Sequence, residues 1–202
     1  MTKTEIATKD EQSEAVALRQ VAAIHVPHEI THLLRKNGFG YLRSRMGNWC
    51  QMAQHRVVLV VTDLDQGHCV VELCQQWQAD QPMAPHLVLR VAVREVESWV
   101  LADHLAMREL IGPRGVLPPK PDELPDPKLA LLHLAKGAPR AVRNDLFRDV
   151  GGQPRQGLGY NARLVEWVRT RWNPELAAER SPSLARARKR LQKTVREFSQ
   201  GY

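Results

Sequence analysis

The chain has 202 residues, of which 43% are hydrophobic and 25% are charged, and its formal net charge at pH 7 is +7. This length fits one large domain, or one domain with a substantial appendage, and it can bury a sizeable core without disulfide bonds. Cys50, Cys69 and Cys74 form no CxxC pair, which favours a reduced cytoplasmic protein over a secreted or zinc-binding one. The polar N-terminus is unlike a secretory signal, and no window approaches the roughly 20 apolar residues of a membrane span. We therefore expect a soluble, cytoplasmic protein with no membrane partner.

The first half of the chain alternates between predicted strands and helices. Residues 57–62 (VVLVVT) are apolar and β-branched and have no helical period, which predicts a strand buried on both faces of a parallel sheet. The predicted elements are, in order, strand 5–8, helix 13–26 with Ser13 as its N-cap, strand 30–34, helix 42–54 after the NGFGY turn, strand 57–62, a helix around 70–77 and strand 86–93 (HLVLRVAV).

The second half is predicted to be helical. Residues 94–110 form broken helices, and six prolines between residues 112 and 127 exclude regular structure and mark a boundary or a lid. Helices then follow at 128–135, 139–147, 161–172 and 183–198, the last with Ser181 or Ser183 as its cap, and GGQPRQGLGY is predicted as a loop. The expected architecture is an α/β core at residues 1–111, a proline-rich connection at 112–127 and a basic, all-helical region at 128–202, packed on or beside the core.

The charge is unevenly distributed along the chain. Residues 136–202 contain 15 Lys and Arg against 6 Asp and Glu, whereas residues 1–135 contain 14 against 16. The basic excess peaks at Arg186, Arg188, Lys189, Arg190, Lys193 and Arg196. Such a stripe is typical of proteins that bind a polyanion, although a solvated helix face with a basic bias gives the same pattern. Because the whole chain is polarised, we favour nucleic acid as the partner.

Two aspartates follow the predicted strand at residues 57–62. Asp63 and Asp65 are two residues apart, so both carboxylates point the same way if the extended backbone continues. Ligands bind at the carboxyl ends of strands in open α/β sheets, and two hard oxygen ligands in that position suit Mg²⁺ or Mn²⁺. An aspartate after a strand is also a common turn former or helix N-cap, so the spacing alone leaves both interpretations open.

Two glutamates follow the strand at residues 86–93 in the same manner. Glu95 and Glu97 would bring further carboxylates to the same edge of the sheet, making an oxygen-rich site for one or two divalent ions. Alternatively, one of them pairs with Arg94 or opens the next helix. The eight histidines form no zinc-binding pattern, and the GxSxG and P-loop motifs are absent from the sequence.

A family resemblance rests on four segments: VVLVVTDLDQ, RVAVREVESWVLAD, DPKLALLHLA and SPSLARARKRL. Together they resemble a group of small bacterial Toprim-like proteins of unknown function. Toprim is the topoisomerase–primase fold, and this group is similar to the nuclease half of the OLD (overcoming lysogenization defect) family, often encoded beside ATPases in mobile or defence loci. The resemblance spans most of the chain. It implies a four-stranded parallel sheet between helices, with Asp63 and Asp65 as the metal-binding DxD pair and Glu97 as the glutamate before the family's tryptophan.

The first motif departs from the pattern of this group. In the group, a strand-ending glutamate is followed five positions later by a second carboxylate that opens the helix. Glu14 fits the second position, but Lys9 stands at the first, and a lysine is a cation that opposes a metal ion. Asp10 or Glu11 replaces the missing carboxylate if the register is shifted; otherwise the chain keeps the fold without catalysis.

We therefore expect a nuclease that depends on Mg²⁺ or Mn²⁺ and acts on DNA or RNA, as an effector in antiviral defence. Asp63, Asp65 and Glu97 hold the metal, which activates water and neutralises charge in the transition state, while Glu11 or Glu14 supplies the first-motif carboxylate. The substrate backbone is bound by Arg186, Arg188, Lys189, Arg190 and Lys193. The alternative is a non-catalytic Toprim module that binds a partner ATPase and nucleic acid, in a homo-oligomer or a hetero-complex.

Overall fold

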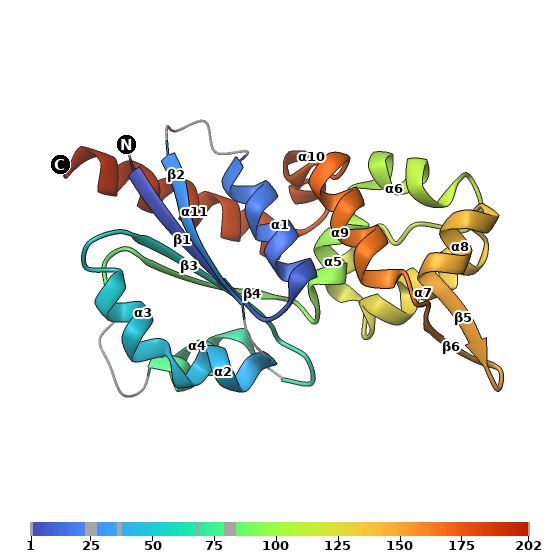
Figure 1. Ribbon diagram of the computed structural model, residues 1–202, viewed down its shortest axis with the longest axis horizontal. Coiled ribbons are helices and arrows are strands. Elements are labelled where there is room, and N and C mark those ends of the chain that lie inside the picture. Colours follow the sequence, from blue (N-terminus) through green and yellow to red (C-terminus); the bar gives the residue numbers. More distant parts are fainter. Residues whose placement is uncertain (1, 23–27, 36–37, 68, 79–83, 202) are drawn as a thin grey trace.

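The computed structural model describes residues 2–22, 28–35, 38–67, 69–78 and 84–201. Its centre is a four-stranded sheet with the order β2-β1-β3-β4, in which all neighbouring strands are parallel. The strands are β1 (Thr2–Thr8), β2 (His28–Arg35), β3 (Val57–Asp63) and β4 (Leu87–Ala92). Helices α1 (Glu11–Ala22) and α11 (Pro182–Gln200) lie on one face, and α2 (Gly38–Ser44), α3 (Met46–Met52) and α4 (Val70–Gln78) lie on the other (Figure 1). The predicted α/β class, with a parallel sheet between helices, is confirmed.

Strand β3 is buried along its whole length. Its side chains alternate between two apolar cores: Val57, Leu59 and Val61 face the core that includes α1 and α11, whereas Val58 and Val60 face the core of α2, α3 and α4. All five are 0% exposed. Because both faces of the strand are covered, its sequence needs no polar alternation, and its β-branched residues suit the extended backbone.

The first strand and helix begin earlier than predicted. Strand β1 starts at Thr2 rather than at residue 5, because Thr2 already pairs with β2. Helix α1 starts at Glu11, so Ser13 lies inside its first turn and is not the N-cap. The predicted helix end at Val26 lies outside the described residues. The turn between β1 and α1 therefore consists of Lys9 and Asp10, at the carboxyl end of a central strand.

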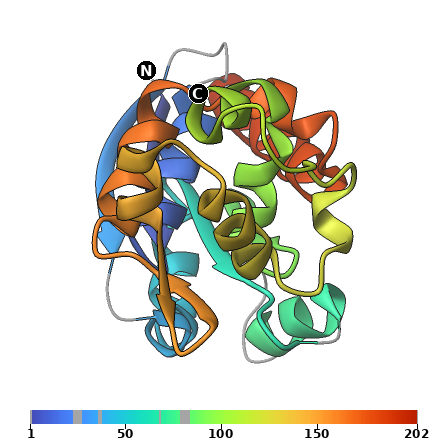
Figure 2. The same ribbon diagram turned by 90° about the vertical axis from the view of Figure 1, so that its right-hand side faces the viewer.

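Beyond the sheet, the chain is mostly helical. The further elements are α5 (Val96–Ala102), α6 (His104–Ile111), a 3₁₀ helix η1 (Pro121–Glu123), α7 (Pro127–Lys136), α8 (Arg140–Leu146), α9 (Tyr160–Thr170) and α10 (Pro174–Ala178). Most of them stand at the carboxyl end of the strands, and Figure 2 looks onto them from that side. Helix α11 then returns along the sheet, and its Ser199 reaches Thr2 of β1, with 2.5 Å between the two hydroxyl oxygens. None of the described helices is both long and apolar enough to cross a membrane.

A β-hairpin interrupts this helical region. Strand β5 (Phe147–Val150) pairs antiparallel with β6 (Gln153–Gln156). Gly151 and Gly152 connect them with φ angles of 61° and 81°, the positive values that a tight two-residue hairpin turn requires. The prediction of an all-helical region is therefore wrong: part of GGQPRQGLGY is a strand, and the helix predicted to reach residue 147 ends at Leu146.

The helical region shares an apolar core with the sheet. Trp99 of α5 donates a hydrogen bond from Nε1 to Ser183 Oγ of α11 at 2.6 Å, and Trp172 donates from Nε1 to the Trp99 carbonyl at 3.1 Å. Both indole rings are fully buried, and both belong to the core that holds one face of β3. These contacts fix α5, and therefore the residues at its N-terminus, relative to the carboxyl edge of the sheet.

Candidate active site at the carboxyl edge of the sheet

Asp63 is the last residue of β3 and is 2% exposed. One carboxylate oxygen, Oδ1, accepts a hydrogen bond from the backbone N–H of Val96 at 2.9 Å, at the start of α5. The other, Oδ2, accepts from Lys9 Nζ at 3.0 Å. The carboxylate is therefore held by backbone on one side and by a cation on the other, at the edge of the sheet where the sequence predicted a site.

Asp65 reaches the same place through a turn rather than along an extended strand. Its φ angle is 48°, in the left-handed region that aspartate tolerates better than most residues. Its backbone N–H donates to the Arg94 carbonyl at 2.8 Å, and its half-exposed carboxylate accepts from Lys9 Nζ at 3.3 and 3.4 Å. The two aspartates thus converge as predicted, but on the ammonium of Lys9.

Lys9 is the cation that joins the DxD pair to the end of β1. Burial lowers the pKa of Lys9, but the charges and hydrogen bonds of Asp63 and Asp65 outweigh this effect, so the pKa stands above its ordinary value. Lys9 is therefore charged at neutral pH. The Lys9 ammonium lies between the two carboxylates.

A second lysine, Lys128, forms ion pairs with both glutamates. Lys128 Nζ lies 3.0 Å from Glu95 Oε1 and 3.5 Å from Glu97 Oε1, and the backbone N–H of Lys128 donates to Glu95 Oε2 at 3.1 Å. Glu97 is 1% exposed and also accepts from the Tyr160 hydroxyl at 3.2 Å. Lys128 and Tyr160 come from the helical region, so that region completes the site.

The pKa values of the buried carboxylates Asp63 and Glu97 are raised by burial and by the charges of neighbouring carboxylates. Burial raises the pKa of Asp63 to about 6 against the opposing effect of Lys9, and the charges of Asp10 and Asp65 raise it further. Burial likewise raises the pKa of Glu97 to about 7 against the opposing effect of Lys128, with further contributions from Glu95 and Asp63. Asp10, Asp63, Asp65, Glu95 and Glu97 therefore belong to one acidic site that contains two ammonium groups.

The structure describes the side chains of only some of the residues predicted for the first motif. Glu11 is exposed at the start of α1, and Glu14 lies in the same helix with its side chain outside the described part of the structure. Asp10 is the carboxylate of this segment that raises the pKa of Asp63. The shifted register, in which Asp10 or Glu11 replaces the missing carboxylate, stays a prediction.

The chemistry of the donors suits a hard divalent ion, but their present arrangement does not form an open metal site. Carboxylate oxygens are the preferred protein ligands of Mg²⁺ and Mn²⁺. Among the described residues, no group of three or more metal-binding side chains converges on one point. At the DxD pair the Lys9 ammonium takes the place between Asp63 and Asp65, so an ion would compete with it for the same oxygens.

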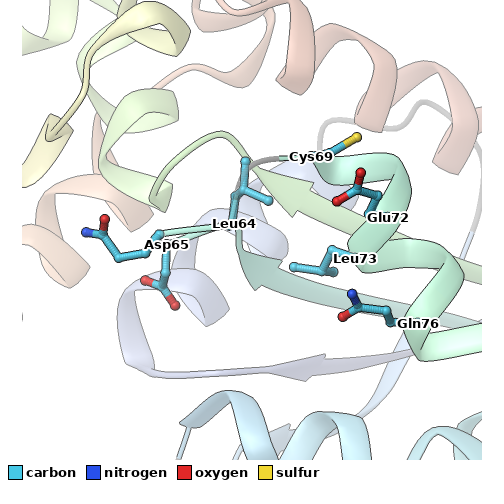
Figure 3. A pocket seen from close by; sticks show the side chains of 8 residues that line it. Leu64, Asp65, Cys69, Glu72, Leu73 and Gln76 are labelled. Atoms are coloured by element: carbon cyan, nitrogen blue, oxygen red, sulfur yellow. The ribbon is translucent and has the colours of Figure 1, made fainter.

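A cleft opens beside this site. It has a volume of about 510 Å³, within the range of roughly 300–1,000 Å³ that is usual for ligand pockets. In Figure 3, Asp65 lies at one end and α4, with Glu72 and Gln76, lies at the other, while Leu73 projects toward Leu64. The cleft leaves room for part of a ligand next to the half-exposed carboxylate of Asp65.

The predicted basic stripe is only partly a surface feature. Arg186, Lys189 and Lys193 are exposed on α11, and Arg190 is half-buried. Arg188 is only 9% exposed, and its guanidinium donates to Glu175 Oε1 at 3.2 Å. Arg188 therefore helps to attach α11 to α10 and is not part of the exposed basic face, which corrects its predicted role.

Comparison with known proteins found no matching family model, no matching curated protein and no matching solved structure.

Proposed function

We propose that the protein is a nuclease that hydrolyses phosphodiester bonds in DNA or RNA with the help of Mg²⁺ or Mn²⁺. The observation that carries this proposal is the position of Asp63, buried at the carboxyl end of the central strand β3 and within electrostatic reach of the buried Glu97. Five carboxylates share this edge with two ammonium groups, and a divalent cation offsets such a negative excess. Strongly shifted pKa values of buried carboxylates also favour a functional site.

The roles of the side chains follow from their contacts. Asp63 and Asp65 would hold the metal in place of the Lys9 ammonium, and Glu97 would help to fix the ion or its waters. The bound metal would supply an activated water and would neutralise the charge that develops on the phosphate. The backbone N–H of Val96 orients Asp63, and Lys128 and Tyr160 orient Glu97. In this proposal Asp10, rather than Glu11 or Glu14, supplies the first-motif carboxylate. The exposed bases of α11 bind the substrate backbone.

A cleavage assay tests the proposal. The protein is incubated with labelled single-stranded and double-stranded DNA and RNA in millimolar Mn²⁺, alone and with the product of any adjacent ATPase gene. Asp63→Asn and Asp65→Asn should each lower cleavage by roughly a hundredfold or more, because a ligand of the metal is lost. Glu166→Gln, an exposed carboxylate of α9, serves as the control and should cleave like the wild type. Cleavage that persists in the double aspartate variant contradicts the mechanism.

A second candidate is a non-catalytic Toprim-like module that binds nucleic acid and a partner ATPase in a bacterial anti-phage system. The observation that favours it is Lys9, whose ammonium forms ion pairs with both DxD aspartates at 3.0 and 3.3 Å. Lys9→Glu separates the two candidates. A wild type that cleaves nothing, together with a Lys9→Glu variant that gains cleavage, would identify a fold kept for assembly.

A further inference from the structure

Arg90 is a charged residue in the middle of an otherwise apolar strand. It lies in β4, the edge strand of the sheet, opposite Val61 of β3. Its neighbours in the alternation, Val88 and Ala92, belong to the core that includes α11, so the Arg90 side chain leaves the strand on the face that α11 covers. Its Nε atom is buried and has no hydrogen-bond partner in the described part of the structure.

Two arginines of α11 lie within electrostatic reach of Arg90. Arg186 and Arg190 are one helical turn apart on the same face of α11, and α11 packs along β4 (Figure 1). Burial lowers the pKa of Arg90, and the positive charges of Arg190 and Arg186 lower it further. Three guanidinium groups from two elements are therefore gathered at one edge of the sheet.

These three arginines lack the carboxylate partners that other arginines of the chain have. Arg188 pairs with Glu175, and Arg163 pairs with Asp145 at 2.5 Å. Within the described residues, no carboxylate forms an ion pair with Arg90, Arg186 or Arg190. Like charges held together without a counter-charge are unfavourable, and a bound anion relieves this repulsion. Guanidinium groups match phosphate oxygens in geometry as well as in charge.

We propose that Arg90, Arg186 and Arg190 form a binding site for the phosphate backbone of a nucleic acid strand, an inference that rests on the nucleic-acid partner of the proposed function. A linear polyanion fits better than a single phosphate ion, because the exposed bases continue along α11 at Lys189, Lys193 and Arg196. At 1.5 Å per residue, the run from residue 186 to residue 196 is about 15 Å long.

The site is positioned to guide a strand toward the carboxylates. Ala92 of β4 pairs with Asp63 of β3, and Arg90 stands two residues earlier in the same strand, which is roughly 7 Å along the strand axis. Val61 and Asp63 alternate onto the same face of the sheet as Arg90. A backbone bound by the three arginines would therefore pass close to the acidic edge.

Binding of a fluorescein-labelled single-stranded oligonucleotide, measured by anisotropy over a range of salt concentrations, tests the proposal. Arg90→Gln should weaken binding at least about fivefold, and each arginine removed should flatten the slope of log affinity against log salt by about 0.7. The double variant Arg186→Gln with Arg190→Gln should change the slope by twice as much. Because this variant alters only α11 and leaves β4 intact, it still tests the site if Arg90→Gln fails to fold. Arg163→Gln removes the same charge from a paired position on α9 and is the control.

The outcomes distinguish this site from the proposed catalysis. If the arginine variants lose binding, the phosphate-binding site is supported. If the wild-type protein also binds the oligonucleotide but never cleaves it, the proposed nuclease activity is contradicted while the site stands. Cleavage and binding that are unchanged in both arginine variants overturn the site alone. Displacement of the oligonucleotide by inorganic phosphate at matched ionic strength would assign the site to a free anion. Equally strong binding of polyglutamate would assign it to an acidic protein, and either result overturns the proposal.

Discussion

Lys9 decides how a divalent metal interacts with this site. Its ammonium donates to Asp63 and Asp65, so a metal that binds these carboxylates has to displace it. Lys9→Gln removes the competing charge and should strengthen Mn²⁺ binding about tenfold or more. Because a ligand of the folded state stabilises it by mass action, such a gain corresponds to about 1.4 kcal/mol. It should appear as a Mn²⁺-dependent rise in melting temperature about 3–6 °C larger than that of the wild type.

The matched control for this measurement is Lys120→Gln. Lys120 forms an exposed ion pair with Glu123 at 2.9 Å, away from the carboxylate edge, so its removal changes the net charge by the same amount. The response of this variant to Mn²⁺ should equal that of the wild type. Equal Mn²⁺ responses in the Lys9→Gln and wild-type proteins would contradict the competition between Lys9 and the metal, and no response in either protein would mean that no metal binds the DxD pair.

Glu97 gives the site a predictable pH dependence. Its pKa rises from 4.5 to about 7 on folding, so the folded protein binds this proton more tightly than the unfolded chain. Its contribution to stability is therefore present at low pH and is lost as the pH rises toward and through 7. Between pH 5.5 and pH 8.0 the loss amounts to about 2 kcal/mol.

Urea denaturation at these two pH values, in the presence of a chelator, measures this contribution. Glu97→Gln keeps the shape of the side chain but cannot titrate, so its unfolding free energy should fall less between pH 5.5 and pH 8.0 than that of the wild type. Glu166→Gln, at an exposed position of α9, should follow the wild-type profile. Identical pH profiles for Glu97→Gln and the wild type would show that Glu97 titrates normally in the folded protein.

At the scale of single residues, the sequence predicts the carboxylates of the site better than their partners. Asp63 and Glu97 follow strand-like runs, and strand ends meet at one edge of a parallel sheet. Lys128 and Tyr160 lie 31 and 63 residues after Glu97 in helices, and no periodicity in those helices indicates that either side chain points to the sheet. The only feature of the sequence that singles out Lys128 is its place in DPKLALLHLA, one of the four segments on which the family resemblance rests.

At the scale of elements, Asp103 links the end of α5 to both α6 and α10. Its Oδ1 accepts from the Ala106 N–H at 3.1 Å and its Oδ2 accepts from the Asn173 N–H at 2.7 Å. Asp103→Ala leaves the buried Ala106 N–H and the partly buried Asn173 N–H without this partner and should lower the unfolding free energy by about 3 kcal/mol. Asp126→Ala, which removes the exposed cap of α7, should cost only about 1 kcal/mol. Urea denaturation compares them, and equal losses would contradict a linking role for Asp103.

The two strands that the sequence analysis does not predict have little buried surface. Strands β5 and β6 are four residues each, and most of their side chains are exposed, so neither has the apolar alternation by which strands are recognised. The signal that was present is the Gly151–Gly152 pair, which is typical of two-residue hairpin turns. By contrast, the buried strand β3 was predicted almost to the residue, because two apolar cores determine its composition.

At the scale of the whole molecule, the acidic site and the basic helix belong to one compact arrangement. The helical region stands at the carboxyl edge of the sheet and supplies Lys128 and Tyr160 to the site, and α11 then runs back along the sheet with its exposed bases (Figure 1). The polarised charge of the sequence is thus distributed around the sheet rather than confined to a separate appendage. The division at residues 111 and 128 stays a prediction, which an unfolding experiment can test.

The last prediction follows from the core that Trp99, Trp172 and Leu191 share with β3. Because these side chains join both halves of the chain, urea unfolding should be a single transition in which far-UV circular dichroism and tryptophan fluorescence coincide. A chain that ends at residue 127 loses the cover over Trp99, which is 0% exposed in the full chain, and should fail to fold or should aggregate. Two separate transitions in the full chain, or a stable fragment 1–127 with a cooperative melt, would instead identify the helical region as an independent domain docked on the sheet.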